Sequence, residues 1–428
     1  MEPIYQVKKI DSPKSIQVQV PGSKSITNRA LMLAALSDGL CVLSGVLFSD
    51  DSRAFLDCLD SLGFEVTIEE EKKIVSILGL GGKIPNRNAR INVRSAGTAA
   101  RFLTVMLAFA GGDYTLESSE QMKKRPMEPL LSVLRQAGVI IHCLEEEGHF
   151  PFQIHSSRIH TSEVAIDTDL SSQFASALIM ASVLLKDGLT VKMLGSRTEG
   201  SYIKITLEMM KQFGIPVTVE ASKCHISYNN TYHINSYEIE PDVSGACYFY
   251  AMAPLLNTSV TVKNVHLNSL QGDIQLLKVL EQLGCELEDK NEGICLTSKN
   301  SSYPGITVNM KDFSDQTMTL SVLAPFATSP TLIKNIGHIR FQESNRMAAI
   351  NQELTKLGIR CEISANQEDL CIYPGEIKPA TIETYEDHRM AMAFTLIGLK
   401  TGSVQISNPS CCKKTFENYF DIIDSLTN

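Results

Sequence analysis

The sequence predicts an α/β protein built from six βαβαββ-like repeats. Short polar or charged segments that run into helices rich in Ala, Leu and Met recur about every 73 residues, a period typical of one supersecondary unit per repeat. They begin at Ser25, Gly97, Ser172, Val243, Asp315 and His388. A second series keeps this period and places a glycine between a helix end and a strand, as in SLGFEV, QAGVII, QFGIPV, QLGCEL and KLGIRC.

The second repeat shows the expected order of elements. We expect a strand, a helix, a strand, a helix and a strand pair at INVR, GTAARFLTVMLAFA, DYTLES, PMEPLLSVLRQAG, VIIHCLEE and FPFQIHSS. The third repeat follows the same order, and the fourth begins with SYEIE. The sixth stops after KTFENYFDIIDSL, so the N-terminal IYQVKKI is a candidate for its missing strand. The best candidate crossover between the halves is NNTYHINS (229–236).

Composition describes an ordinary globular protein. A chain of 428 residues with 43% hydrophobic and 20% charged residues is long enough for two or three domains. The N-terminus lacks the apolar core of a signal peptide, and the longest apolar stretch, 174–185, fits a buried helix better than a membrane span. Eleven scattered cysteines without a CxxC pair predict a reduced, cytoplasmic protein with no zinc site. A net charge of −9 argues against general nucleic-acid binding.

The helix starts of the first half carry groups suited to anions. Free backbone N–H groups and the helix dipole favour anions at such positions, and a glycine there lets a ligand approach the backbone. Each segment alone is as well explained as a helix cap or a surface base. The candidates are Lys24, Ser25, Arg29, Gly97, Thr98, Arg125, Ser171, Ser172 and Gln173.

The second half repeats this arrangement with added acids. Asp242 and Asp315 stand where helix N-caps are expected, and Glu343 and Arg346 have the spacing of a helix-surface ion pair. The remaining candidates are His388, Arg389, Lys413 and Lys414. Because so many polar groups recur at equivalent repeat positions, we predict one face in each half that binds phosphates or carboxylates. Two such faces across a cleft would hold a pair of polyanionic ligands.

Together, these segments resemble one enzyme family. From Pro21 to Phe420 they follow the order and spacing of the 5-enolpyruvylshikimate-3-phosphate synthase family: PGSKSITNRALMLAAL, SAGTAARFL, KKRPM, DLSSQF, SDQTMTL, QESNRM, EDHRMAMAF and KKTFENYF. The resemblance implies two domains, each an inside-out α/β barrel of three βαβαββ repeats, with the active site in the cleft between them. We expect one domain over 21–236 and the other over 1–20 plus 237–428, and a monomer.

The resemblance also implies a reaction. The family transfers the enolpyruvyl group of phosphoenolpyruvate to the 5-hydroxyl of shikimate 3-phosphate and releases phosphate, through a tetrahedral intermediate. Such an addition needs a base at the acceptor oxygen and an acid at the methylene carbon. Asp315 matches the base and Glu343 the acid, with Lys24 as a further proton donor. The resemblance implies no metal, no organic cofactor, and only small-molecule substrates.

The binding residues are implied position by position. Those that match the family's phosphoenolpyruvate contacts are Lys24, Gly97, Arg125, Gln173, Arg346, Arg389 and Lys414. Those that match its shikimate 3-phosphate contacts are Ser25, Arg29, Ser171, Ser172, Gln173, Tyr202, Asp315, His338 and Gln342.

Several positions depart from the family's pattern. Gln342 stands where the family usually has Lys, and Glu199 where many members have Ser; the other departures are Phe102, His338 and Asn345. Most border the shikimate-phosphate half. The lost Lys and the added Glu weaken attraction for a sugar-like phosphate by about 1 kcal/mol. Reaction type is therefore better supported than the identity of the acceptor.

Three alternatives remain. The first is a related enolpyruvyl transferase that acts on UDP-N-acetylglucosamine, but the segment 111–124 lacks the reactive Cys typical of that family, and the SITNR and DHRM motifs argue against it. The second is a catalytically silent anion-binding paralogue, which the retained Asp315, Glu343 and Lys24 disfavour. The third is a structural repeat protein, which would not need so many bases beside two acids.

Overall fold

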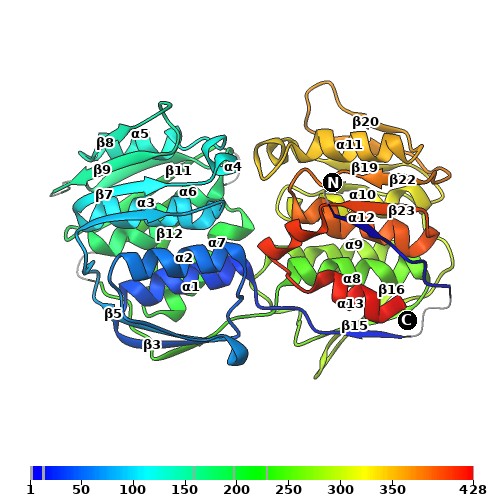
Figure 1. Cartoon of the computed structure of the whole chain (residues 1–428), viewed down its shortest axis with the longest axis horizontal. Helices are drawn as coiled ribbons and strands as arrows, with labels where there is room; N and C mark the ends of the chain where they lie inside the picture. Colours follow the sequence, from blue (N-terminus) through cyan, green and yellow to red (C-terminus); the bar gives the residue numbers. More distant parts are fainter. Residues whose placement is uncertain are drawn as a thin grey trace. The chain divides into compact units, whose positions relative to one another are not determined.

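The computed structural model describes residues 3–11, 15–157, 159, 161–195, 198–227 and 230–427. The chain divides into two compact units, which we call the central unit (Gly22–Glu240) and the terminal unit (Met1–Pro21 with Pro241–Asn428). Within the described ranges, the strands form six mixed sheets, three in each unit (Figure 1). The chain is an α/β protein, as the sequence predicts. The candidate crossover at 229–236 lies partly outside the described residues.

Each sheet of the central unit has four strands in one pattern. A parallel pair comes first, and two strands then add antiparallel. The sheets are, in spatial order, β14 (Ser236–Glu238), β3 (Asp38–Ser44), β5 (Ile74–Leu80) and β4 (Val66–Glu69); β6 (Asn88–Asn92), β7 (Gly112–Glu117), β9 (Phe152–Ser156) and β8 (Ile140–Cys143); β10 (Glu163–Asp167), β11 (Leu189–Leu194), β13 (Lys223–Ile226) and β12 (Thr218–Glu220).

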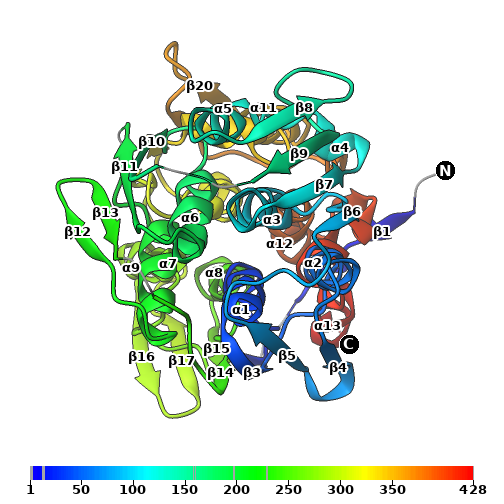
Figure 2. The same cartoon turned by 90° about the vertical axis from the view of Figure 1, so that its left-hand side faces the viewer.

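Three helices of the central unit are buried along almost their whole length: α1 (Lys24–Leu36), α3 (Gly97–Ala110) and α6 (Ser172–Ala181). Figure 2 shows the three sheets outside these helices. Their Ala-rich sequences allow this close packing, because small side chains let helices approach one another. The other helices expose one side: α2 (Asp50–Ser61), α4 (Glu120–Lys123), α5 (Glu128–Gln136) and α7 (Ser201–Gln212).

The terminal unit repeats the strand pattern, with one variation. Its sheets are, in spatial order, β16 (Cys285–Lys290), β17 (Gly293–Ser298), β15 (Ser259–Lys263) and β2 (Ile16–Val18); β18 (Thr307–Asn309), β19 (Thr331–Lys334), β21 (Leu370–Ile372) and β20 (Cys361–Ile363); β1 (Ile4–Gln6), β23 (Val404–Ser407) and β22 (Ala380–Ile382). The third sheet has only three strands, and β1 pairs antiparallel with β23. The prediction that the N-terminus supplies a strand to the last repeat is confirmed.

The helices of the terminal unit are also of two kinds. Three are buried almost throughout: α8 (Val243–Leu256), α10 (Thr317–Leu323) and α12 (His388–Thr401). The others expose one side: α9 (Leu276–Gln282), α11 (Arg346–Lys356) and α13 (Tyr419–Thr427). No helix in the described part of the chain is long and apolar enough to cross a membrane.

One strand assignment from the sequence is wrong. SYEIE was expected to open the fourth repeat, but β14 pairs parallel with β3 of the first. Conversely, β2, which precedes α1, pairs parallel with β15 in the sheet of the fourth repeat. The two strands that precede α1 and α8 are therefore exchanged between the units. The chain passes from the central unit to the terminal unit after Glu240.

Candidate active site

The residues singled out in the sequence gather at helix starts. In the central unit, α1 begins at Lys24, α3 at Gly97 and α6 at Ser172, whose preceding Ser171 caps the helix by accepting a hydrogen bond from Gln173 N. In the terminal unit, α11 begins at Arg346. Each helix start leaves backbone N–H groups without intrahelical partners, so both units present donors where the sequence predicts anion binding.

Arg29 ties the start of α1 to the first turns of α7. Its side chain is 1% exposed, and it donates to the Thr206 hydroxyl at 2.8 Å, to Ser25 O at 2.9 Å and to Tyr202 O at 3.2 Å. Its guanidinium also lies 5.3 Å from the centre of the Phe102 ring, which gives that departure from the family's pattern a packing role. Burial lowers the pKa of Arg29 to about 10. Arg29 therefore fixes the backbone of Ser25 and Tyr202, and its contact with a ligand stays a prediction.

Arg125 lies against the backbone at the start of α3. A Cβ atom at Gly97 would come within 2.6 Å of Arg125 Nη1 and 2.9 Å of Arg101 Nη1, so glycine is needed for this approach. The Nε atom of Arg125 and the Oε1 atom of Gln173 are buried and have no hydrogen-bond partner among the residues that the structure describes. Buried polar atoms are rarely left unpaired in folded proteins, so both indicate a site that a polar ligand completes.

Lys24 lies near an acid of the same unit. Its Nζ atom lies 3.7 Å from a carboxylate oxygen of Asp51, which is itself almost fully buried in the first turn of α2. Sequence reasoning missed Asp51, although an acid in the first turn of a helix is a recognisable signal. Glu199, by contrast, is exposed. Its charge is therefore screened by solvent and disturbs the site less than a buried acid would.

The terminal unit holds a dense cluster of charges around Arg346, whose side chain is 1% exposed. Its guanidinium donates to Asp387 at 2.8 Å, to Glu343 at 2.9 Å and to Asp315 at 3.0 Å. Burial alone would lower the pKa of Arg346, but these three carboxylates outweigh it and raise that pKa. The planar fork of arginine suits this arrangement because it presents several donors at once.

Arg389 approaches the same acid from α12. Its Nη2 donates to the second carboxylate oxygen of Asp315 at 2.8 Å, so Asp315 is held between two arginines. Asp315 lies in the 3-10 turn η4 (Ser314–Gln316) and is 8% exposed.

Lys414, 7% exposed, ends the 3-10 segment η7 (Pro409–Lys414). Asp387 was missed as an individual residue, but its position before α12 is a recognisable N-cap, and it accepts from Arg389 N at 3.0 Å.

The three departures in this unit have structural explanations. Gln342 accepts a hydrogen bond from Arg346, a contact that a lysine at this position would replace with charge repulsion. His338 lies 2.7 Å, Nε2 to Oγ, from Ser314, the residue before Asp315. Asn345 caps α11 by accepting from Ala348 N, which an aspartate would do equally well. The changed side chains thus support the cluster around Arg346.

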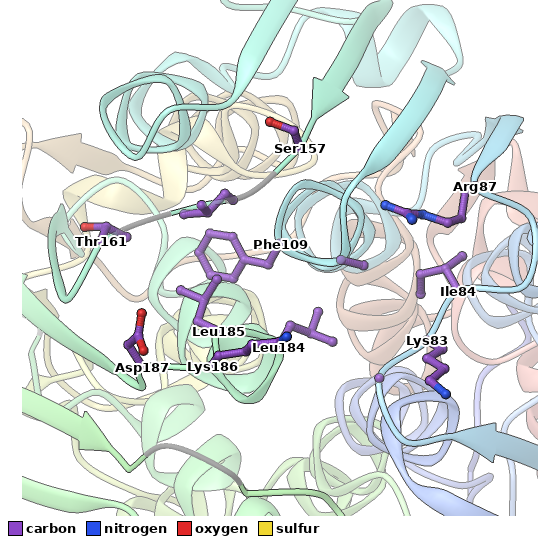
Figure 3. Close-up of a pocket in the computed structure, with 13 residues that line it drawn as sticks. Lys83, Ile84, Arg87, Phe109, Ser157, Thr161, Leu184, Leu185, Lys186 and Asp187 are labelled. Atoms are coloured by element: carbon purple, nitrogen blue, oxygen red, sulfur yellow. The ribbon is translucent and has the colours of Figure 1, made fainter.

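A cavity of about 740 Å³ in the central unit lies apart from these residues. Figure 3 shows Arg87 and Ile84 on one side and Asp187 on the other, with Phe109 and Leu185 between them. Its walls include the C-terminal end of α3, whereas Gly97 begins that helix. Since α3 has 14 residues, the two ends are about 20 Å apart. None of the predicted site residues lines this cavity.

Comparisons with known proteins give one consistent result. The family model for EPSP synthase (3-phosphoshikimate 1-carboxyvinyltransferase) matches residues 9–423. The 3-phosphoshikimate 1-carboxyvinyltransferase of Trichormus variabilis is 40% identical over 415 residues, 96% of each chain. That numbered 2 from Halalkalibacterium halodurans is 36% identical, over 96% of this chain and 91% of the relative.

The fold agrees with a solved structure. EPSP synthase from Acinetobacter baumannii matches with a TM-score of 0.83 at 21% identity, over 99% of this chain and 98% of that one. At that identity the likeness shows the fold alone. The family model spans nearly the whole chain, and the relatives in sequence exceed 30% identity. The chain therefore belongs to the EPSP synthase (3-phosphoshikimate 1-carboxyvinyltransferase) family.

Proposed function

We propose that this protein transfers the enolpyruvyl group of phosphoenolpyruvate to the 5-hydroxyl of shikimate 3-phosphate and releases phosphate. It thereby acts in the shikimate pathway of aromatic amino-acid biosynthesis. The observation that carries the proposal is the convergence of Arg346 and Arg389 on Asp315. Two cationic forks beside one carboxylate combine a binding site for an acidic substrate with a proton acceptor for an alcohol.

The donor site is assigned to the cationic groups of both units. Phosphoenolpyruvate carries a carboxylate and a phosphate, and paired N–H donors of arginine match either group. In the central unit this assignment is supported by Arg125 Nε and Gln173 Oε1, which are buried without a partner within the described ranges. We assign to this substrate Lys24, Gly97, Arg125, Gln173, Arg346, Arg389 and Lys414.

The acceptor site is assigned mainly to the central unit. Its shikimate 3-phosphate contacts are proposed as Ser25, Arg29, Ser171, Ser172, Gln173 and Tyr202, with Asp315, His338 and Gln342 from the terminal unit. Hydroxyl groups and helix-start N–H groups suit a phosphorylated polyol, because each donates to oxygen without bringing bulk.

The proton transfers follow from the reaction. Asp315 takes the proton of the 5-hydroxyl as its oxygen bonds to C2 of phosphoenolpyruvate, and Glu343 or Lys24 protonates the methylene to a methyl group. The conjugate base left on that residue then removes a proton from the methyl group, the double bond re-forms and the C–O bond to phosphate breaks. Binding of the donor carboxylate to Arg346 and Arg389 competes with Asp315 for the same donors. Donor binding therefore releases the base that the next step requires.

The finer architecture belongs to this proposal. We assign to the protein the family's inside-out α/β barrels with three βαβαββ repeats each, the domains 21–236 and 1–20 plus 237–428, and one active site between them. We also propose that the protein is a monomer and lies in the cytoplasm. Among the described residues, five four-stranded sheets with one strand pattern and a sixth sheet of three strands support the repeat count.

The test is phosphate release by the purified protein with shikimate 3-phosphate and phosphoenolpyruvate together, and with each omitted in turn. We expect release only with both, accompanied by the enolpyruvyl product. Release with UDP-N-acetylglucosamine in place of shikimate 3-phosphate would assign a different acceptor. No release with either, while phosphoenolpyruvate still raises the melting temperature, would indicate a binding protein.

A methyl group at position 97 is expected to weaken donor binding. In Gly97→Ala the new Cβ displaces the Arg125 guanidinium, whose Nη1 would otherwise lie 2.6 Å away. We expect the KM for phosphoenolpyruvate to rise about tenfold, as losing a good hydrogen bond to a charged group does. The melting temperature should change little, because alanine suits a helix start of ordinary backbone geometry. An unchanged KM would remove Arg125 from the donor site.

A further inference from the structure

Asp273 is a buried carboxylate that the reaction as written above does not use. It lies in the 3-10 segment η3 (Gly272–Gln275) and is 6% exposed. One of its oxygens, Oδ2, accepts two hydrogen bonds, from the Ser244 hydroxyl and from Gln316 Nε2 at 2.8 Å. Ser244 belongs to the first turn of α8, and Gln316 ends η4. A single oxygen atom therefore joins three segments that are distant in the sequence.

Both hydrogen-bond partners of Asp273 adjoin residues of the predicted site: Ser244 contacts Arg389, and Gln316 follows Asp315 in the chain. Arg389 Nη2 lies 3.4 Å from the Ser244 oxygen, and this hydroxyl accepts from Arg389 because its own proton goes to Asp273. Gln316 directly follows Asp315. Its Oε1 accepts from the Thr319 hydroxyl at 2.8 Å, which leaves its NH₂ group to face Asp273.

We propose that Asp273 is a positioning residue for the transfer reaction, which holds Arg389 through Ser244 and the Asp315 turn through Gln316. The proposal rests on the proposed function, since it presumes that Arg389 binds the donor and Asp315 takes the proton. Asp273 touches neither substrate in this scheme. Its contribution is orientation, and small misplacements of reacting groups cost up to about 100-fold in rate.

The raised pKa of Asp273 indicates that a contribution to folding stability does not explain why a carboxylate is buried at this position. Burial, and then the neighbouring charge of Asp315, raise the pKa of Asp273 to about 6, against the opposing influence of Arg389 and the hydrogen bonds from Ser244 and Gln316. The titratable and charged groups that face it are Asp315 from η4, Arg389 from α12 and Cys247 from α8.

Because the pKa of Asp273 is raised in the folded state, its ionisation changes the stability of the protein with pH. An unfolded Asp ionises near pH 3.9, so between about pH 4 and pH 6 the folded state binds more protons than the unfolded one. The ionised carboxylate therefore destabilises the folded state above pH 6, and this penalty is absent below pH 4. A carboxylate kept only for stability would show the opposite trend. A group that orients the active site can carry such a cost.

The first test is Asp273→Asn, which keeps the shape and removes the charge. We expect kcat/KM for phosphoenolpyruvate to fall 10- to 100-fold. The melting temperature of the substrate-free variant, relative to the wild type, should be higher at pH 8 than at pH 5. A merely structural carboxylate would instead lower the melting temperature of the variant most at pH 8.

A matched control is Glu353→Gln in the same unit. Glu353 is also a buried carboxylate, but the groups that donate to it are Tyr385, Lys356 and the backbone N–H of Glu383 rather than Arg346 or Arg389. We expect this variant to lose melting temperature while kcat and KM stay within about twofold of the wild type. Comparison with this control separates loss of stability from loss of orientation.

Ser244→Ala tests the pathway from Asp273 to Arg389 with the carboxylate left in place. We expect KM for phosphoenolpyruvate to rise about tenfold, and the double variant with Asp273→Asn to be no worse in KM than Asp273→Asn alone. Fold losses that multiply in the double variant would show that Ser244 and Asp273 act separately. If Asp273→Asn fails to fold, Ser244→Ala alone tests the proposal, and an unchanged KM for phosphoenolpyruvate in that variant would overturn it.

The outcomes distinguish the two proposals. If the wild-type protein releases no phosphate from any of the substrate pairs, the proposed function fails and this inference fails with it. If the wild type is active and Asp273→Asn retains its kcat/KM, only the inference is overturned. A kinetic loss in Asp273→Asn no larger than that of Glu353→Gln would overturn it equally.

Discussion

Replacing Asp315 by Asn is expected to lower kcat by about 10³-fold, within the range lost when a general base is removed. Affinity for phosphoenolpyruvate should stay the same or increase. The reason is that Asp315 occupies donors of both Arg346 and Arg389, at 3.0 and 2.8 Å, which the carboxylate of the substrate also needs. An amide pairs with these arginines less strongly than a carboxylate does. Steady-state rates and calorimetric titration with phosphoenolpyruvate measure the two effects separately.

A matched control is Asp289→Asn on β16 of the same unit. Asp289 accepts hydrogen bonds from Leu267 N and from His266 near the surface, so we expect turnover close to that of the wild type. If Asp315→Asn keeps more than a tenth of the wild-type kcat, Asp315 is not the base. Equal losses in kcat and in affinity would instead make Asp315 a binding residue.

The sequence predicted local structure well, because local signals specify it. The helices that begin at Lys24, Gly97 and Ser172 start at the predicted residues or one before them. The glycines that end helices have positive φ angles: Gly63, Gly138, Gly214, Gly284 and Gly358. A left-handed residue at this position favours glycine strongly, so the motif is readable without any tertiary information.

Strand partners were predicted less well, because nothing local distinguishes them. SYEIE at β14 and SIQVQV at β2 both have the alternating pattern of a half-buried strand, and each precedes a buried helix. Which sheet each one joins depends on the path of the chain between the units, and that path is a property of the whole fold. The pairing of β14 with β3 therefore became visible only in the structure.

The candidate site shows the same division. The sequence identified Arg346, Arg389 and Asp315, because they stand in motifs at helix starts. Asp273, Ser244 and Gln316 escaped notice, since the segment around Asp273 reads as an ordinary turn and its burial depends on three segments that meet in space. Departures such as Asn345 seemed more serious in the sequence than in the structure, where the residue caps α11.

The negative and positive charges around Arg346 nearly cancel, so the terminal unit tolerates the loss of a single charged side chain poorly. Asp315, Glu343 and Asp387 are three carboxylates, and the hydrogen-bonded cations among them are Arg346 and Arg389. Asp387 is fully buried. Removing one partner of a buried ion pair is costly, because the remaining charge has neither water nor a counter-ion. Arg346 donates to all three carboxylates, so folding of the terminal unit is expected to depend strongly on it.

Arg346→Met is therefore expected to destabilise the terminal unit by about 3–5 kcal/mol. For a unit of this size that loss corresponds to a fall in melting temperature of about 10 °C. The fall should be larger at pH 8 than at pH 5, because protonation of the stranded carboxylates relieves their repulsion at the lower pH. Thermal unfolding followed by circular dichroism at both pH values measures this difference in melting temperature.

Arg360→Met is the control, since Arg360 pairs with Glu362 at the surface with 66% of its side chain exposed. Such exposed pairs contribute little, so its melting temperature should match the wild type. If the two variants unfold at the same temperature, the cluster around Arg346 does not hold the unit together, and its charges serve the substrate alone.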